Sequence, residues 1–218
     1  ALVFELSKVQ LDHVRKRVLG QLRNVDDSLA ARLADGLGVE LPAAIAPAKG
    51  PVDLPASKAL SILKSVPPVA GRCLAILVSD GADGQVVTAL QSAAKAKGAS
   101  TKVIAPKVGG VRLKGGKVLP ADEKIDGAPS VLFDAIALVL SEEGAELMTG
   151  EKAALDFVSD AFAHCKAIGH TAAAKPLLDK AGIVPDAFCL ALPDAAKTLV
   201  DRLPQRHWDR EKVVKLPV

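Results

Sequence analysis

The sequence contains no tyrosine among its 218 residues. Any reaction or cofactor site that depends on a tyrosine ligand, nucleophile or acid is therefore excluded for this chain. An excess of one charge is also lacking, because the formal net charge is only +3. So small a charge gives no strong attraction to nucleic acid or to an anionic membrane, and neither is expected as a partner.

Cysteine is scarce and widely spaced. The three cysteines Cys73, Cys165 and Cys189 are odd in number and form no C-x-x-C pair, which argues against a disulfide framework and against a zinc site. All three lie in apolar segments, where a cysteine usually acts as a small buried hydrophobic residue. We therefore expect three buried and unreactive thiols.

Long apolar runs and a targeting signal are lacking too. The longest apolar runs, such as residues 136–140, are far too short to span a bilayer. Residues 1–8 show no signal-peptide pattern and begin without methionine, so we expect a processed or excised piece of a longer protein. Half of the residues are hydrophobic, which suffices for one sizeable core with appendages.

One stretch is locally basic, because no acidic residue occurs between Gln91 and Pro120. No aromatic residue alternates with its cations, so a platform for stacking single-stranded bases is absent. A solvated face is favoured over a nucleic-acid patch. The cations of this stretch are Lys95, Lys97, Lys102, Lys107, Arg112, Lys114 and Lys117.

Two appendages precede the main domain. Residues 1–41 are predicted to form a helical segment, with two helices over residues 4–41; Asp26 or Asp27 caps the second, and Gly36 ends it. This segment is too small to bury its own apolar stripe, so we expect it to pack on something larger. Residues 42–68 hold six of the 14 prolines and are predicted to form an extended linker.

Residues 69–218 alternate between short apolar runs and helical patterns, which predicts an α/β domain with a mostly parallel sheet. The run at residues 73–78 is typical of a strand that is covered on both faces. A small hairpin is predicted around Lys114-Gly115-Gly116. Further strands are predicted over residues 102–105, 134–140, 166–169 and 188–190, and helices over residues 86–97, 152–164, 171–180 and 193–206.

Sites on parallel sheets lie at the carboxyl ends of the strands, which here are residues 79–84, 141–144 and 169–171. At the first end, the G-x-G-x-x-G spacing of a dinucleotide site is absent, and Asp80 and Asp83 place negative charge where phosphate would lie. An ordinary turn with aspartate caps is favoured there. A phospho-receiver is rejected because the central strand ends at Ser141, where an aspartate would be needed.

The third strand end has the pattern of a nucleophile elbow, because a strand runs directly into a helix. Its elbow position is Gly169, which has neither thiol nor hydroxyl, and a general base such as His170 does nothing without a nucleophile. We interpret His170 as a surface or capping residue. Cys165 lies too early in the segment to reach the elbow. The other histidines lie in different elements without the ligand spacing of a metal site, and they are His13, His164 and His207.

Residues 167–171, Ala-Ile-Gly-His-Thr, resemble the Ala-Ile-Cys-His-Gly frame of the PfpI-like superfamily, which is related to class I glutamine amidotransferases. Residues 74–83 are also similar to that family's first strand and loop. The resemblance implies a three-layer, flavodoxin-like domain with a degenerate elbow at Gly169, His170 and Thr171. The family's supporting glutamate would fall near Val86, so catalysis is not carried over. The neighbours of this lost site are Asp80, Asp83, Val86, Ser141 and Glu142.

The flanks resemble a narrower family. Residues 4–9, 22–26 and 34–38 are similar to the helical segment that follows the catalytic core of large-subunit haem catalases. Residues 206–211, with their His-Trp pair, are similar to the ending of these catalases, which carry a carboxyl-terminal PfpI-like domain after a linker. The resemblance covers essentially the whole chain, and its specificity comes from the order of these parts.

This resemblance implies that haem, with its tyrosine ligand, belongs to a parent core outside this chain. The chain itself would hold no cofactor or metal and would not decompose peroxide. Its expected role is to stabilise the parent catalase and its tetramer through contacts with the core and neighbouring subunits. Holdase-type binding of unfolded client proteins is a further hypothesis. The alternative is a PfpI-like hydrolase or glyoxalase with a displaced cysteine such as Cys165. A bacterial parent favours a cytoplasmic location.

Overall fold

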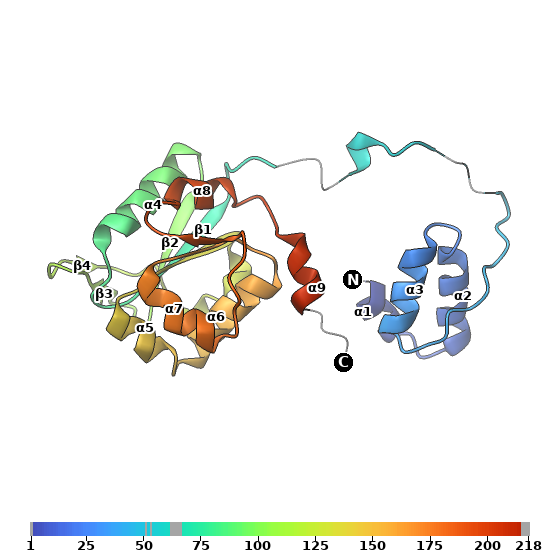
Figure 1. Cartoon of the computed structure of the whole chain (residues 1–218), viewed down its shortest axis with the longest axis horizontal. Helices are drawn as coiled ribbons and strands as arrows, with labels where there is room; N and C mark the ends of the chain where they lie inside the picture. The colour runs from blue at the N-terminus through green and yellow to red at the C-terminus, as the bar shows by residue number, and fades with distance from the viewer. Residues whose placement is uncertain (1, 51, 53, 62–66, 215–218) are drawn as a thin grey trace. The chain divides into compact units, whose positions relative to one another are not determined.

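The structure is a computed structural model that describes residues 2–50, 52, 54–61 and 67–214. The chain divides into two compact units, residues 1–61 and 62–218, which are described separately (Figure 1). The predicted linker includes residues 51, 53 and 62–66, and the predicted main domain includes residues 215–218; these positions lie outside the described residues. Among the described residues, none of the helices has the length and apolar character that crossing a membrane requires.

The described residues of the first unit form three α-helices, where the sequence pattern predicts two. The first predicted helix is split, because Arg15 turns back and donates hydrogen bonds to the terminal carbonyls of Leu6 (3.2 Å) and Ser7 (3.0 Å), which satisfies a helix end. The predicted cap of the last helix is confirmed, since Asp26 accepts from the backbone N–H of Leu29 at 2.9 Å. The helices are α1 (Leu2–Ser7), α2 (Asp12–Leu22) and α3 (Asp27–Gly36).

A small apolar core joins α2 to α3. The start of the predicted linker is held against this pair, because the backbone N–H of Ile45 donates to the carbonyl of Gly20 at 3.0 Å. The side-chain amide of Asn24 also donates to the carbonyl of Ile45 at 2.7 Å. Farther along, the described linker residues form one short 3₁₀ turn, Lys58–Leu60. The buried members of this core are Leu19, Leu33 and Ala34.

The second unit is built on a six-stranded sheet with the strand order β5-β2-β1-β6-β7-β8. Every pairing in it is parallel, which confirms the predicted α/β fold. The strand order reverses at β1, since β2 is added on one side and β6 on the other. The strands are β1 (Cys73–Val78), β2 (Ser100–Ala105), β5 (Glu123–Lys124), β6 (Ala135–Val139), β7 (Ile168–His170) and β8 (Cys189–Ala191).

Helices cover both faces of this sheet, which gives three layers (Figure 1). The helices α4 and α8 share one core with Leu74, Ile76 and Val78 of β1. The helices α5, α6 and α7 share the other core with Ala75 and Leu77. Successive residues of β1 thus enter both cores, which explains its continuous apolar run. The helices are α4 (Gly84–Ala96), α5 (Glu142–Met148), α6 (Lys152–Ala163), α7 (Lys175–Lys180), α8 (Ala196–Asp201) and α9 (Glu211–Val214).

Several predicted elements differ at their ends. The hairpin is confirmed, as β3 (Val111–Arg112) pairs antiparallel with β4 (Val118–Leu119). The sequence pattern does not predict α5, which is only seven residues long. The helix predicted from Thr171 is wrong at its start, because a 3₁₀ turn, Ala172–Ala174, precedes α7. Proline in the first turn of α7 explains this later start, since its fixed φ favours the beginning of a helix.

Candidate functional site

The strand order places the candidate site at the carboxyl edge of the sheet, between β1 and β6. In parallel sheets, ligands bind in the crevice that opens where the strand order reverses. The predicted site residues follow β1, β6 and β7 along this edge. Whether a ligand has room there depends on the side chains and loops that fill it.

Two serine hydroxyls close the gap between the ends of β1 and β6. The Ser79 hydroxyl oxygen accepts from the backbone N–H of Ser141 at 2.9 Å, and the Ser141 hydroxyl donates to the carbonyl of Asp80 at 2.6 Å. Ser141 Oγ also accepts from the N–H of Gly144 at 3.0 Å and so caps α5. A Cβ atom on Gly144 would lie 2.1 Å from Ser79 Oγ. Backbone and hydroxyl groups that bind one another therefore fill this crevice.

The β3–β4 hairpin is fastened to the loop that follows β1. The Asp80 carboxylate accepts from the backbone N–H of Arg112 at 2.7 Å, and the N–H of Gly81 donates to the carbonyl of Arg112 at 2.7 Å. The N–H of Lys114 donates to the carbonyl of Ala82 at 2.9 Å. The groups of this loop that would face a ligand are thus engaged by the hairpin.

Gly169 lies inside β7, where it pairs with Ala137 of β6 and Leu190 of β8. A Cβ atom at this position would lie 2.4 Å from Cδ2 of Leu199 and 3.2 Å from Cδ1 of Leu192. The missing side chain therefore lets α8 approach the sheet closely. The space that a nucleophile would need is occupied by leucine side chains, and the idea that this segment is a lost catalytic elbow stays a prediction.

The two residues after Gly169 make local contacts. His170 is half-buried, and its Nδ1 atom lies 3.3 Å from the carbonyl oxygen of Thr171. The Thr171 hydroxyl donates to the carbonyl of Leu140 at 3.3 Å and so joins the ends of β6 and β7. Both side chains thus contact backbone groups at the carboxyl edge of the sheet and help to hold the strand ends together.

The remaining predicted site residues take separate structural positions. Asp83 caps α4 by accepting from the N–H of Gln85 at 2.8 Å. Val86 is buried in the core between α4 and the sheet. Glu142 is exposed in the first turn of α5.

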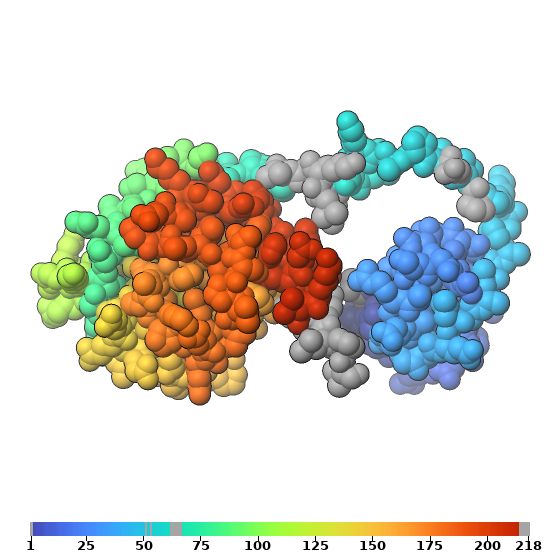
Figure 2. All heavy atoms as spheres, viewed as in Figure 1, coloured from blue at the N-terminus to red at the C-terminus, as the bar shows by residue number. Residues whose placement is uncertain are grey.

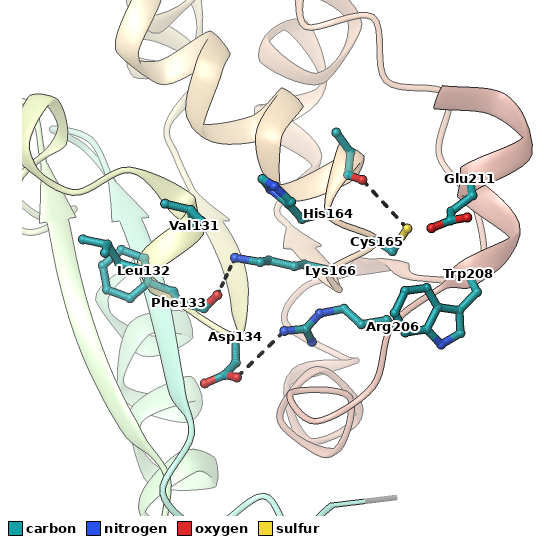
Figure 3. Close-up of a pocket in the computed structure, with 11 residues that line it drawn as sticks. Val131, Leu132, Phe133, Asp134, His164, Cys165, Lys166, Arg206, Trp208 and Glu211 are labelled. Carbon is teal, nitrogen blue, oxygen red and sulfur yellow. Dashed lines mark hydrogen bonds and ion pairs between the residues drawn. The ribbon is translucent and has the colours of Figure 1, made fainter. Parts of the chain in front are cut away.

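Charged groups gather instead at the opposite, amino edge of the sheet (Figure 3). A hollow of about 460 Å³ lies there between the segment before β6, the end of α6 and the carboxyl-terminal tail. Lys166 is only 4% exposed, and its Nζ donates to the carbonyls of Ser130 (2.7 Å) and Phe133 (2.6 Å). Burial lowers the pKa of Lys166 to about 8, and the Arg206 cation acts in the same direction.

A buried arginine fastens the tail to this edge. Arg210 is 2% exposed, and its guanidinium binds both carboxylate oxygens of Asp186, at 2.6 and 2.8 Å. It also donates to the carbonyl of Lys166 at 2.5 Å. Burial alone would raise the pKa of Asp186, but hydrogen bonds from Arg210 and from the N–H of Phe188 hold it below its ordinary value. This paired, hydrogen-bonded charge joins the tail to the starts of β7 and β8.

The cysteines lie away from the carboxyl edge. Cys165 precedes β7 and is buried at the amino edge, so the length of this strand separates it from the site that the elbow pattern predicts. The prediction of three buried thiols is wrong for Cys73 and Cys189, which are only half-buried. Partial burial still raises the pKa of the Cys189 thiol, which favours its unreactive form. Among the described residues, no three His, Cys, Asp or Glu side chains are grouped so that they could hold a metal ion.

Sequence reasoning missed the charged cluster at the amino edge, although one signal for it was present. Lys166 stands between Cys165 and Ala167 in an otherwise apolar run. A lysine in such a position is almost never buried without a partner. The tail residue Arg210 follows the His-Trp pair, whose role in the fold is visible only when the tail is seen to pack on the sheet.

Two family models match the chain. Residues 70–210 match the C-terminal domain found in long catalases. Residues 1–37 match a family described as catalase-related immune-responsive. The first match covers the six-stranded sheet and helices α4 to α8, and the second covers α1, α2 and α3.

The chain is also similar to parts of several catalases. It is 44% identical to Catalase C of Rhizobium meliloti, with 99% of this chain and 32% of that protein covered. It is 31% identical to Catalase HPII of Pseudomonas aeruginosa (97% and 30% covered) and 36% identical to Catalase HPII of Mycobacterium avium (84% and 26% covered). The chain thus spans less than a third of these relatives. It belongs to the family of flavodoxin-like C-terminal domains of long catalases.

Proposed function

We propose that this chain is a non-catalytic domain that stabilises a long catalase and its assembly. The observation that carries the proposal is the packing at Gly169, where Leu199 and Leu192 occupy the space that a nucleophile would need. Nucleophilic catalysis requires a thiol, hydroxyl or similar group aimed at the substrate. The hydroxyls of Ser79 and Ser141 instead bind backbone groups of the edge itself.

Peroxide decomposition would belong to a haem core outside this chain. The axial ligand expected from the catalase resemblance is a tyrosine, and this sequence has none. The residues present therefore do not fit haem ligation of that kind.

A domain stabilises an assembly when it binds the assembled state more tightly than the dissociated one. This domain is suited to such a role because it has a core on each face of its sheet and a tail that Arg210 fastens to it. We expect its partners to be the parent core and neighbouring subunits.

The test is removal of residues 70–210 from the full-length parent. We expect peroxide turnover per haem to stay within about twofold, while the temperature at which subunits dissociate falls by about 5 °C or more. The matched control is the full-length parent carrying Gly127→Ala, since a Cβ atom at that position meets nothing within 4 Å. Loss of turnover per haem in an intact assembly, or an unchanged dissociation temperature, would contradict the proposal.

Holdase-type binding of partly unfolded proteins is a second proposed activity. It is supported by three exposed apolar side chains of the linker, Val52, Leu54 and Leu60, which are 74–85% exposed, because exposed apolar surface marks binding sites. We expect the chain to slow heat-induced aggregation of a client at equimolar ratio, and replacement of these three residues by serine to abolish the effect. The activity is rejected if the unchanged chain gives no protection.

The PfpI-like enzyme remains the alternative, with Cys165 as the displaced nucleophile. Thiol labelling distinguishes it from the non-catalytic domain. We expect Cys165 to react with iodoacetamide at pH 7 far more slowly than a free thiol, because it is only 3% exposed. Rapid labelling in the folded chain would favour the enzyme.

A further inference from the structure

A cationic hairpin, residues 107–118, projects from the second unit on the carboxyl side of the sheet (Figures 1 and 2). Its four cations are exposed, it contains no acidic residue, and no ion pair to these cations occurs in the described part of the chain. Lys97, which follows the far end of α4, is paired by contrast with Asp201 at 3.0 Å. The cations are Lys107, Arg112, Lys114 and Lys117.

The hairpin also exposes apolar surface on a fixed frame. Val108 is 73% exposed and Val118 is 52% exposed. The stem is held by the hydrogen bonds of Arg112 to Asp80 and Gly81, and the N–H of Leu113 donates to the carbonyl of Lys117 at 2.8 Å. A surface that is fixed before it binds loses little conformational entropy on binding.

An acidic surface lies beside it. The helix α5 exposes Glu142, Glu143 and Glu146, and its Leu147 is 70% exposed. Both surfaces flank the turn after β1, because Ser141 at the start of α5 donates to the carbonyl of Asp80. The two other carboxylates of this region, Asp80 and Asp83, are engaged by backbone N–H groups.

We propose that the carboxyl edge is a contact surface for a second copy of this chain. In a two-fold interface the same patch meets itself, so a basic half and an acidic half placed side by side are self-complementary. The cationic hairpin of one copy would face α5 of the other, and the reverse, with Val108, Val118 and Leu147 as the apolar centre. Apolar centres with charged rims are typical of protein interfaces.

A second copy fits this edge better than nucleic acid does. The hairpin carries no aromatic residue on which a base would stack. The glutamates of α5 would repel phosphates that approached the same edge. Exposed valines beside the lysines have no role in binding phosphate, whereas they bury well against an apolar protein side chain.

The role of this contact in the parent protein rests on the proposed function, because the contact would join the domains of neighbouring subunits. Its test uses this chain alone and is therefore independent of the deletion experiment in the parent. Exposed ion pairs are individually weak and screened by salt. We expect a weak dimer that dissociates about tenfold more readily at 500 mM than at 50 mM NaCl.

The experiment is sedimentation equilibrium of two charge-reversed variants. Each variant repels its own copies at both contacts and is expected to be monomeric, while an equimolar mixture of the two is expected to form a heterodimer. A variant carrying both sets is expected to dimerise again, which separates loss of contact from loss of folding. The sets are Lys107→Glu, Lys114→Glu and Lys117→Glu for the hairpin, and Glu142→Lys, Glu143→Lys and Glu146→Lys for α5.

The matched control reverses three exposed lysines on other helices, Lys95→Glu, Lys180→Glu and Lys197→Glu. It is expected to dimerise like the unchanged chain. The proposal is overturned if the unchanged chain stays monomeric at 50 mM NaCl up to about 0.5 mM, within the effective concentrations that a shared assembly provides. It is also overturned if the mixture does not associate, or if the chain binds a DNA duplex with steep salt dependence and does not self-associate.

Discussion

The two edges of the sheet differ in what fills them. At the carboxyl edge, close contacts of glycines with Ser79 and Leu199 fill the space beside the ends of β1, β6 and β7, and a hollow of about 520 Å³ lies farther out, between Asp80 and the hairpin. At the amino edge, the buried cations Lys166 and Arg210 are held by backbone carbonyls and by Asp186. In this domain the strand ends at the edge that usually binds ligands are packed against one another, and the opposite edge concentrates the buried charge. Shifted pKa values are common at catalytic sites. At this amino edge, the packing that attaches the tail explains the lowered pKa values of Lys166 and Asp186 equally well.

The largest effect is expected at the amino edge. Asp186→Ala leaves the buried guanidinium of Arg210 without its carboxylate, which costs about 3–5 kcal/mol of unfolding free energy. Because the pKa of Asp186 is lowered in the folded chain, this contribution is present above the ordinary pKa of 3.8 and disappears as the pH falls through the lowered value. Urea unfolding at pH 7 and pH 3 measures both effects. Asp179→Ala, which breaks an exposed pair with Lys175, is the control and should cost less than about 0.5 kcal/mol.

The carboxyl edge should be most sensitive at Gly144. Gly144→Ala places a Cβ atom 2.1 Å from Ser79 Oγ and 2.2 Å from Ser79 Cβ, and we expect a loss of about 3 kcal/mol. Ser79→Gly in the same chain removes both clashing atoms and should restore part of the loss. Thermal unfolding of the two single variants and the double variant measures this. Equal losses with and without Ser79→Gly would contradict the close contact.

A smaller effect is expected at Gly169. Gly169→Ala requires Leu199 to move, because its Cδ2 atom would lie 2.4 Å from the new Cβ, and we expect a cost of about 1–3 kcal/mol. In a Leu199→Ala background the same substitution should be nearly neutral. A double-mutant cycle in urea gives this coupling directly. Additive losses would show that Leu199 does not occupy the space beside Gly169.

The smallest effect is a pH dependence at Lys166. Its pKa falls from 10.5 to about 8 in the folded chain, so between these values the unfolded chain binds more protons and stability rises with pH. We expect a gain of about 1–2 kcal/mol between about pH 8 and about pH 9.5, relative to Lys166→Met. Lys180→Met replaces an exposed lysine and should keep the pH dependence of the unchanged chain. If the stabilities of the unchanged chain and of Lys166→Met varied with pH in the same way, the lowered pKa of Lys166 would be contradicted.

The fold was largely predictable because its signals are local. The apolar run of β1 and the Asp26 cap each follow from a few neighbouring residues, and both are confirmed. The closure of the carboxyl edge was not predictable, because Gly169 and Leu199 are 30 residues apart and meet only through tertiary packing. The pairing of Arg210 with Asp186 was missed for the same reason, since no sequence pattern near either residue indicates its partner.

The most direct measurement is the reactivity of a thiol placed at position 169. Gly169→Cys restores the nucleophile of the elbow pattern, and alkylation at that residue is followed by peptide mass spectrometry while circular dichroism and thermal unfolding confirm the fold. We expect the thiol to be protected in the folded chain at pH 7 and to react only on unfolding, because leucines fill the space around it. Rapid alkylation of folded protein, with a thiol pKa below 7, would show that the carboxyl edge is an open site and would contradict its closure.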